Sequence, residues 1–205
     1  MRIGICGGTF DPFHRGHLEP ILKVREELEW DRVIYIPAHV QPFKQDRDFA
    51  SGYHRFTMIS LAILDHDALF ASEIELERGR VSYSVETLQE LRATWPHATI
   101  DWIIGDDNLA KLSEWKSLDR IFELANFVVL TRGGQTLLPA HQPRLTTPRS
   151  RPTHGTISMA RNEMVPVSST EIRKRVRDGE PIEDLVPPPV SRYIQHNGLY
   201  RKDES

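Results

Sequence analysis

The segment from Gly7 to His17 holds the residue types best suited to binding phosphate. It reads Gly-Gly-Thr-Phe-Asp-Pro-Phe-His-Arg-Gly-His and lies between a predicted strand and a predicted helix. Glycine lets a backbone turn sharply and approach a ligand closely. The amino end of a helix offers unpaired N–H groups and a positive dipole end, which favour phosphate. His14 and His17 are three residues apart, so on one helical turn both face the same side and can donate hydrogen bonds to phosphate oxygens.

Parts of this segment, taken separately, are open to other interpretations. A Gly-Gly pair after a strand is often only a tight turn. Two histidines can belong to a metal site, but no third ligand follows at metal-ligand spacing. The segment has neither the GxxxxGK[ST] spacing of a phosphate-binding loop nor the GxGxxG spacing of a dinucleotide fingerprint. The eleven residues together are far more specific than any of these parts.

Polar residues also follow three other predicted strands. Gly105-Asp106-Asp107, Arg132 and Ser168-Ser169-Thr170 each lie just after such a strand. In an open parallel sheet, ligands bind outside the carboxyl ends of the strands. We therefore expect these residues to converge with Gly7-Gly8-Thr9 on one site.

The segment from Ser168 to Arg173 has two interpretations. Ser168 or Ser169 can cap a helix, with Arg173 as a solvated cation on its surface. The same geometry, a capped helix start with an arginine one turn in, also makes an anion clamp. Beside the Gly7–His17 segment, we favour the clamp.

Four further residues are open to a structural or a functional role. Trp115 has the helical spacing of a core residue, but its neighbours on both sides are polar. Tyr83 and Ser84 can cap the helix that follows them. Lys44 is either an ordinary surface lysine or a phosphate ligand.

Short apolar runs alternate with helical patterns, which predicts a doubly wound, mostly parallel α/β sheet. Several runs are continuously apolar, as is typical of parallel strands covered on both faces. The predicted strands are Ile3–Cys6, Val33–Ile36, Ala71–Leu76, Ile100–Ile104, Phe127–Leu130 and Met164–Val167. The predicted helices run from Leu18 to Leu28, after Ser51, from Val85 to Leu91, from Leu109 to Phe122 with a break near Lys116, from Ser169 to Asp178 and from Val190 to Asn197.

The length of 205 residues predicts a single domain over 1–205, with C-terminal helices within 169–200. Residues 133–162 lack periodicity and predict a long irregular insertion. One cysteine excludes an internal disulfide framework and fits a reducing compartment. No apolar run approaches the roughly 18 residues that would span a bilayer, and the N-terminus does not resemble a signal peptide. We therefore expect a cytoplasmic protein without a membrane partner.

The net charge of −3 argues against a globally basic nucleic-acid binder. The charge is uneven, because residues 132–177 carry nine Lys or Arg residues against two Glu residues. Either these cations line an anionic ligand or they are solvated. A nucleic-acid partner ranks last, because the segment lacks interleaved aromatic residues. We assign Arg132 and Arg173 to a nucleotide site and regard Arg144, Arg149, Arg151 and Arg161 as solvated.

The Gly7–His17 segment resembles the GGTFDPxHxGH motif of the nucleotidyltransferase superfamily. Within it, the chain resembles the bacterial nicotinate-nucleotide adenylyltransferases over nearly its whole length. The other matching segments are Pro42-Phe43-Lys44, Ser82–Leu88, Ile103–Trp115, Val128–Gly133, Ser168–Arg173 and Val190–Tyr200. The chain departs from the family pattern at Ser84 (usually Thr), Lys116 (usually Tyr or His) and Gly133 (usually Pro).

The resemblance implies a Rossmann-like fold and adenylyl transfer from ATP to nicotinate mononucleotide, giving deamido-NAD and pyrophosphate. The acceptor is itself an anionic phosphate, which agrees with the absence of a Ser-His-Asp or Cys-His arrangement. Mg²⁺ is expected to enter with ATP rather than in an all-protein site, so no metal-ligating residue is predicted. The sequence does not decide whether the chain forms a homo-oligomer.

The resemblance also assigns roles to individual residues. Catalytic roles fall to His14, His17 and Arg173, with His17 favoured for the transition state. ATP or its phosphates are assigned to Gly7, Gly8, Thr9, Phe10, Lys44, Gly105, Asp107, Arg132, Ser168, Ser169 and Thr170. Nicotinate binding is assigned to Tyr83, Ser84 and Trp115.

Three alternatives remain open. The acceptor could instead be nicotinamide mononucleotide or phosphopantetheine. Enzymes of the phosphopantetheine type usually have Thr in place of His14 and a shorter chain. A nucleotide-binding sensor without turnover is the alternative from another class, and the joint presence of both histidines and the Ser168–Arg173 motif favours catalysis.

Overall fold

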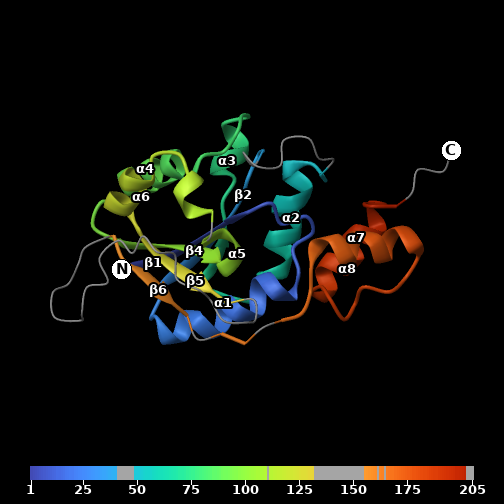
Figure 1. The fold of residues 1–205 in the computed structure, drawn as a ribbon. Helices are drawn as coiled ribbons and strands as arrows, with labels where there is room; N and C mark the ends of the chain where they lie inside the picture. Colours follow the sequence, from blue (N-terminus) through green and yellow to red (C-terminus); the bar gives the residue numbers. More distant parts are fainter. Residues whose placement is uncertain (41–48, 110, 132–154, 161, 164, 202–205) are drawn as a thin grey trace.

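The computed structural model describes residues 1–40, 49–109, 111–131, 155–160, 162–163 and 165–201. Within these residues, six strands form one sheet in the order β3-β2-β1-β4-β5-β6 (Figure 1). Every pair of neighbouring strands is parallel. The predicted doubly wound α/β fold is confirmed.

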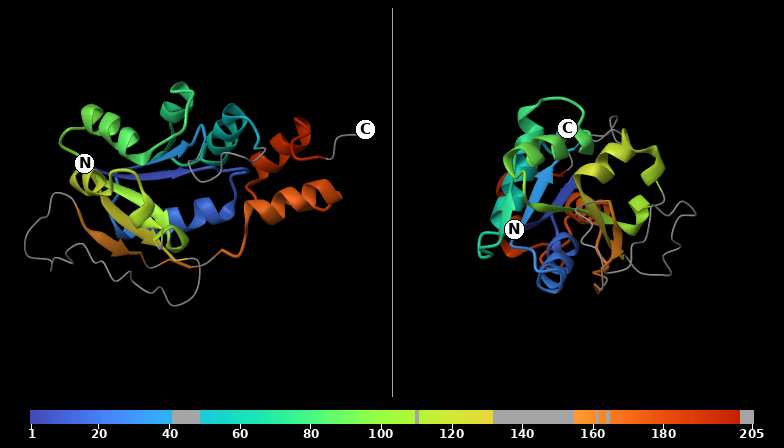
Figure 2. Two further views of the ribbon diagram at one scale, coloured as in Figure 1. Left: turned by 45° about the horizontal axis from the view of Figure 1, so that its top comes forward. Right: turned by 90° about the vertical axis from the view of Figure 1, so that its left-hand side faces the viewer.

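The strands are β1 Arg2–Gly8, β2 Arg32–Pro37, β3 Leu69–Ala71, β4 Thr99–Gly105, β5 Asn126–Leu130 and β6 Ile157–Met159. The helices are α1 Arg15–Glu27, α2 Gly52–Ala62, α3 Ile74–Glu77, α4 Ser84–Thr94, α5 Asp106–Leu109, a 3₁₀ turn at Leu112–Glu114, α6 Leu118–Leu124, α7 Ser169–Asp178 and α8 Pro188–His196. Figure 2 shows α7 and α8 beyond the end of the sheet at which β1 finishes.

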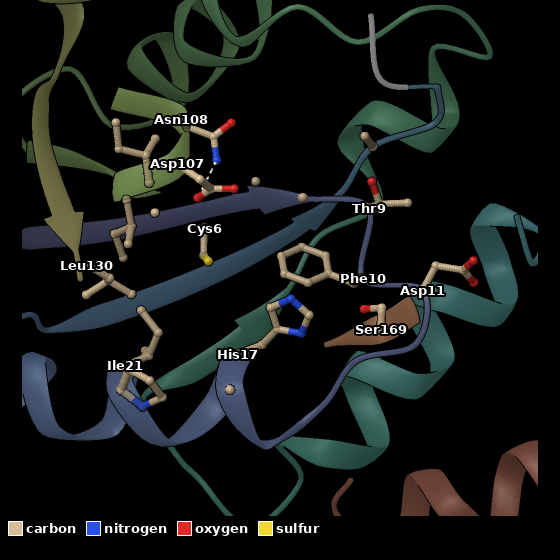
Figure 3. Close-up of a pocket in the computed structure, with 18 of the residues that line it drawn as sticks. Cys6, Thr9, Phe10, Asp11, His17, Ile21, Asp107, Asn108, Leu130 and Ser169 are labelled. Carbon is tan, nitrogen blue, oxygen red and sulfur yellow. Dashed lines mark hydrogen bonds between the residues drawn. The ribbon is translucent and has the colours of Figure 1, made fainter. Parts of the chain in front are cut away.

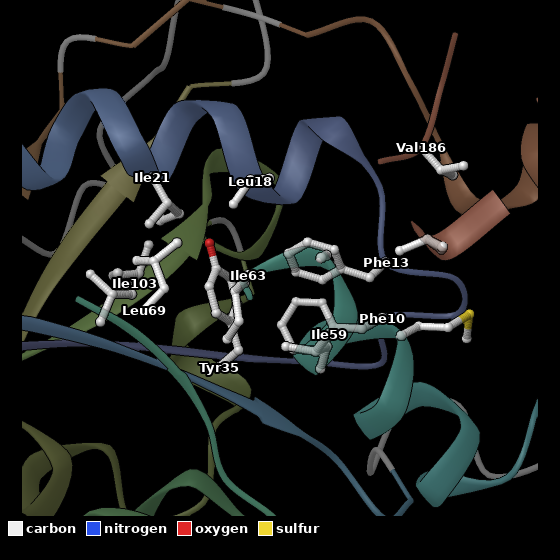
Figure 4. Close-up of a cluster of buried hydrophobic side chains, with 14 of the residues drawn as sticks. Phe10, Phe13, Leu18, Ile21, Tyr35, Ile59, Ile63, Leu69, Ile103 and Val186 are labelled. Atoms are coloured by element: carbon white, nitrogen blue, oxygen red, sulfur yellow. The ribbon is translucent and has the colours of Figure 1, made fainter. Parts of the chain in front are cut away.

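The central strands are apolar on both faces because helices cover both faces. In β2, Tyr35 belongs to one core cluster, whereas Ile34 and Ile36 belong to the other. The first core packs under α1 and α2 and is joined by residues of α7 and α8; Figure 4 shows Tyr35 beside Leu18 and Ile21 of α1. The second core packs under α4, α5 and α6. The two-residue side-chain period of a strand thus divides one continuous apolar run between two cores.

Two predicted strands were wrong in position. The apolar run Ala71–Leu76 was predicted as a strand, but β3 is Leu69–Ala71 and Ile74–Glu77 forms the short helix α3. The last strand was predicted at Met164–Val167, but it is Ile157–Met159, inside the stretch interpreted as an irregular insertion. Both are short edge strands, whose pairing depends on neighbours distant in the sequence more than on local pattern.

The predicted helix Leu109–Phe122 is in fact the end of α5, a 3₁₀ turn and α6, but its predicted break near Lys116 is confirmed. The helical pattern from Leu109 is interrupted at Trp115–Ser117, where Ser117 has a left-handed φ of 56°. Helix α7 spans the predicted residues and ends at Gly179, whose φ of 73° suits a glycine C-cap. Helix α8 begins with Pro188 in its first turn, where proline loses no helical hydrogen bond. None of the helices described is both long and apolar enough to cross a membrane.

Candidate active site

The order of the strands predicts where a ligand binds. From β1 the chain proceeds outward through β2 to β3, and it then returns to place β4 on the other side of β1. The crevice outside the carboxyl ends of β1 and β4 is therefore a topological switch point, the usual ligand position in such sheets. A cavity of about 1030 Å³ opens there, lined by Cys6–Gly8 of β1 and Trp102–Gly105 of β4.

Every predicted site residue that the structure describes lines this cavity. Figure 3 shows residues from both sides of it, with Asp107 and Asn108 on one side of β1 and His17 with Phe10 on the other. Lys44 and Arg132 lie outside the described residues, so their roles stay predictions. The predicted residues that line the cavity are Gly7, Gly8, Thr9, Phe10, His14, His17, Tyr83, Ser84, Gly105, Asp107, Trp115, Ser168, Ser169, Thr170 and Arg173.

His14 and His17 lie together at the amino end of α1. His14 is the residue before the helix, and the centroids of the two rings are 3.6 Å apart in a stacked arrangement. The backbone N–H of His14 donates to Nδ1 of His17 over 3.3 Å. In the neutral ring this bond assigns the proton of His17 to Nε2, which can then donate to an anion. The Phe10 and His17 rings pack in a T-shaped arrangement with centroids 5.0 Å apart, which restricts the orientation of the His17 ring.

The glycines are required by close packing. Gly7 and Gly8 are the last residues of β1 rather than a turn after it. A Cβ at Gly8 would lie 2.9 Å from the ring of Phe10, which itself has a positive φ of 53°. A Cβ at Gly16 would lie 2.9 Å from Val167, in the segment that leads into α7. These contacts bring the loop after β1 (residues 9–14, the β1 loop), α1 and α7 together around the cavity.

The start of α7 lines the cavity with polar side chains on the same side as His14 and His17. Ser168 caps the helix, because its Oγ accepts from the N–H of Glu171 over 3.2 Å. Ser169 instead donates to the carbonyl of Pro12 over 3.1 Å and so ties α7 to the β1 loop. Nη1 of Arg173 donates to the carbonyl of Asp11, and Nη2 lies 3.5 Å from Oγ1 of Thr170. The structure therefore confirms the predicted cap at Ser168 and places Arg173 beside it at the cavity, while the anion clamp stays a prediction.

Another wall of the cavity comes from the other face of the sheet. Trp115 packs against Phe127 of the second core, with ring centroids 5.9 Å apart, and also lines the cavity. Among the described residues, its Nε1 has no hydrogen-bond partner. Tyr83 precedes α4 and Ser84 begins it, and neither makes a side-chain cap. Nζ of Lys116 lies 4.1 Å from the centroid of the Tyr83 ring, a cation–π contact.

The ends of β4 and β5 complete the cavity. Gly105 ends β4, and Asp107 in the first turn of α5 accepts from the Nδ2 of Asn108 over 3.3 Å. Asn162 was not predicted, although it holds Thr131 at the cavity wall by two bonds of 2.9 Å, one from the Thr131 N–H and one to its carbonyl. The stretch interpreted as an irregular insertion therefore ends in a residue that shapes the site.

The burial of two charged side chains at the loop after β1, residues 9–14, was not predicted. Arg55 of α2 is 2% exposed and donates to the carbonyls of Thr9 and Ala38, each over 2.7 Å, and to that of Ala50 over 3.0 Å. Asp11 is 1% exposed. Burial raises the pKa of the Asp11 carboxyl, whereas its hydrogen bond from Tyr200 and the charge of Arg173 lower it. Asp11 lies in the predicted motif, but Arg55 carries no local pattern that distinguishes it from a surface arginine.

Glu75 is a third buried group beside the cavity that the sequence did not reveal. Its carboxylate accepts from Oγ1 of Thr87 over 2.6 Å, and burial raises its pKa. Because Thr87 lies in the first turn of α4 and Glu75 in α3, this bond fixes the start of α4, where Tyr83 and Ser84 face the cavity.

The cations in residues 132–177 that the structure describes are divided between the cavity and the surface. Arg173 lines the cavity, whereas Arg175 pairs with Glu171 and Asp184 on the surface. Arg144, Arg149, Arg151 and Arg161 lie outside the described residues. In the part of the chain that is described, no group of three or more His, Cys, Asp or Glu side chains is arranged to hold a metal ion.

The chain is similar to known proteins over most or all of its length. Residues 5–175 match the family described as cytidylyltransferase-like. Two curated relatives, from Herpetosiphon aurantiacus and Thermoanaerobacter sp. strain X514, each carry the name "Probable nicotinate-nucleotide adenylyltransferase". The first is 39% identical over 98% of both chains, and the second is 36% identical over 100% of this chain and 96% of its own.

A solved structure shares the fold. It is the nicotinic acid mononucleotide adenylyltransferase of Plasmodium falciparum complexed with NaAD, which matches with a TM-score of 0.73 over 97% of each chain at 18% identity. Because the full-length relatives exceed 30% identity, the resemblance found in the motifs is confirmed. The chain belongs to the cytidylyltransferase-like family and, within it, to the nicotinate-nucleotide adenylyltransferases.

Proposed function

We propose that this protein transfers the adenylyl group of ATP to nicotinate mononucleotide in NAD biosynthesis. An oxygen of the mononucleotide phosphate attacks the α-phosphorus of ATP, and the bond from that phosphorus to the bridging oxygen of the β-phosphate breaks. The products are deamido-NAD and pyrophosphate. The observation that carries the proposal is the gathering of His14, His17, Arg173, Tyr83 and Trp115 around one cavity at the switch point.

The phosphate side of the cavity is assigned to α1 and α7. Nε2 of His17 donates to an α-phosphate oxygen as negative charge builds up there, and His14 supports the ring by stacking. Arg173 and the residues Ser168–Thr170 hold the β- and γ-phosphates. Catalysis then consists of positioning the two nucleotides and stabilising charge with donors that the fold already holds in place.

The nucleoside parts are assigned to the strand ends. The Gly8 and Thr9 backbone lies against the nucleotide, and Asp107 contacts a ribose hydroxyl. Mg²⁺ is proposed to enter with ATP, coordinated by phosphate oxygens and water, because Mg²⁺ dehydrates reluctantly and binds well through substrate phosphates. When bound, it neutralises phosphate charge.

The acceptor side is assigned to Trp115, Tyr83 and Ser84. The indole ring stacks on the pyridine, and the amino end of α4 receives the nicotinate carboxylate. The direct test combines purified protein with ATP, MgCl₂ and nicotinate mononucleotide and follows pyrophosphate release and the mass of the product. Deamido-NAD formed in equal amount with pyrophosphate supports the proposal, and ATP binding without product contradicts it.

Replacing Trp115 with alanine is expected to raise KM for the mononucleotide by about tenfold or more, the scale of losing base stacking on an aromatic ring. KM for ATP is expected to change by less than about twofold. Steady-state kinetics with each substrate varied in turn measures both, and Trp115→Phe serves as the control that keeps a ring. Equal effects on both substrates would mean that Trp115 is only a structural residue.

Replacing Lys116 with methionine is expected to reduce the preference for nicotinate over nicotinamide mononucleotide. Lys116 lines the cavity with Tyr83 and Ser84, and its Nζ lies 3.5 Å from Glu86. Glu86 also pairs with Arg80 over 2.7 Å, so one carboxylate meets two cations and does not neutralise both. Because Lys116 is half exposed, we expect a loss of about fivefold in the ratio of kcat/KM values, or ~1 kcal/mol. Lys116→Arg should keep the ratio, and an unchanged ratio in Lys116→Met would show that the charge plays no part.

A further inference from the structure

The C-terminal turn of the chain returns to the phosphate side of the cavity. After α8, Tyr200 donates its phenolic hydroxyl to Oδ1 of Asp11, 189 residues earlier in the sequence. Tyr200 has a positive φ of 65°, and its ring packs against the first core. The mechanism assigned above uses neither Tyr200 nor Asp11, although Asp11 lines the cavity in the middle of the Gly7–His17 motif.

Asp11 makes its other contacts to groups that shape the site. Oδ1 also accepts from the N–H of Ala50 over 3.2 Å. Oδ2 lies 3.7 Å from Nη1 of Arg173, a longer contact than a hydrogen bond, while that same nitrogen donates to the backbone carbonyl of Asp11. Arg173 is 18% exposed, and it lines the cavity beside the buried carboxylate of Asp11.

These contacts affect whether the Arg173 guanidinium pairs with the Asp11 carboxylate or stays available to a polyphosphate. An arginine and a carboxylate readily form a bidentate pair, with two parallel hydrogen bonds, when both oxygens of the carboxylate are available. Here Tyr200 and Ala50 occupy Oδ1, so only Oδ2 faces Arg173. With the phenolic hydroxyl gone, the carboxylate could turn and close on Arg173, which would draw the guanidinium away from a polyphosphate.

We propose that Tyr200 is a positioning residue for ATP: by holding Asp11, it keeps the Arg173 guanidinium directed at the triphosphate. The proposal rests on the proposed function in its assignment of the triphosphate to Arg173. It makes the turn after α8 part of the ATP side of the site.

The test is the Kd of ATP, measured by isothermal titration calorimetry with MgCl₂ on the full chain. Tyr200→Phe keeps the ring and removes only the hydroxyl, and we expect it to weaken ATP binding by roughly five- to tenfold. The matched control is Tyr193→Phe. Tyr193 of α8 also makes one side-chain hydrogen bond to another element, with Nδ1 of His54 in α2 over 2.9 Å, but neither residue lines the cavity.

Tyr193→Phe is expected to lower Tm by about as much as Tyr200→Phe and to leave the Kd of ATP unchanged. A double-mutant cycle tests whether Tyr200 acts through Asp11. The Asp11→Asn background removes the charge that competes for Arg173, so Tyr200→Phe should have little further effect on the Kd of ATP in it. If Tyr200→Phe leaves the Kd of ATP unchanged, or if both tyrosine variants weaken it equally, the proposal is overturned. Because binding is measured without turnover, a failure of the proposed reaction would be seen separately, as absence of product from the wild-type protein.

Discussion

Replacing His17 with alanine is expected to lower kcat/KM at least ~100-fold, about 3 kcal/mol of transition-state stabilisation, the scale of removing one preorganised donor. The reason lies in how firmly the ring is held. The His14 N–H fixes Nδ1, the His14 ring stacks at 3.6 Å, and the rings of Phe10 and Phe13 contact the His17 ring at 5.0 and 5.4 Å. A donor held this way costs little reorganisation when charge builds up on the α-phosphate.

The measurement is the initial rate of pyrophosphate release over a range of both substrates. His97→Ala is the control, because His97 is exposed and does not line the cavity, and its activity should match the wild type. Circular dichroism and thermal unfolding should show that His17→Ala keeps its fold. Near-normal turnover in a folded His17→Ala protein would remove His17 from the mechanism.

Replacing Asp101 with alanine is expected to lower the free energy of unfolding by about 3 kcal/mol or more. Asp101 is fully buried in β4, and its carboxylate accepts from Nε1 of Trp30 and Nε of Arg2, each over 2.6 Å, and from Nδ2 of Asn126 over 3.0 Å. These bonds join β1, β4, β5 and the loop after α1. The substitution leaves a buried indole N–H and a buried amide without their acceptor, and it leaves a cavity.

Urea unfolding measures the loss of stability, and Asp31→Ala is the matched control. Asp31 also binds Arg2, at the backbone N–H, but it is 57% exposed, so its removal should cost less than about 1 kcal/mol. Because Asp101 does not line the cavity, kcat of the folded Asp101→Ala protein should stay near the wild-type value. A loss of less than about 1 kcal/mol, or a loss of kcat in the folded variant, would contradict this assignment.

The parts of the fold that could be predicted are those with a strong local pattern. Helix α7 has a capping serine before it, and its start was predicted from that residue. Strands β1, β4 and β5 each contain a run of mostly apolar, buried residues, and this local pattern predicted them. Most of the predicted site residues lie at a strand end or a helix start, and the parallel sheet brings such positions to one edge. Trp115 lies at neither and was named from the resemblance, and the roles of all these residues stay predictions.

The parts that could not be predicted depend on contacts distant in the sequence. Edge strand β6 is placed beside β5 partly by Asn126, whose Oδ1 accepts from the backbone and the side chain of Thr156. Arg55 carries no local signal, because its partner Thr9 lies 46 residues away. Tyr200 lies in the Val190–Tyr200 segment that resembles the family, but nothing local indicates its bond to Asp11, 189 residues earlier. The residues that hold the motif in shape were therefore harder to find than the motif itself.

The acceptor of the adenylyl group is identified most directly by comparing candidate acceptors in one assay. Pyrophosphate release is followed with ATP and three acceptors side by side: nicotinate mononucleotide, nicotinamide mononucleotide and phosphopantetheine. We expect the highest kcat/KM with nicotinate mononucleotide, a clearly lower value with the nicotinamide form, which lacks the carboxylate, and no turnover with phosphopantetheine. Turnover that is fastest with either of the other two acceptors, or absent with all three, would contradict it.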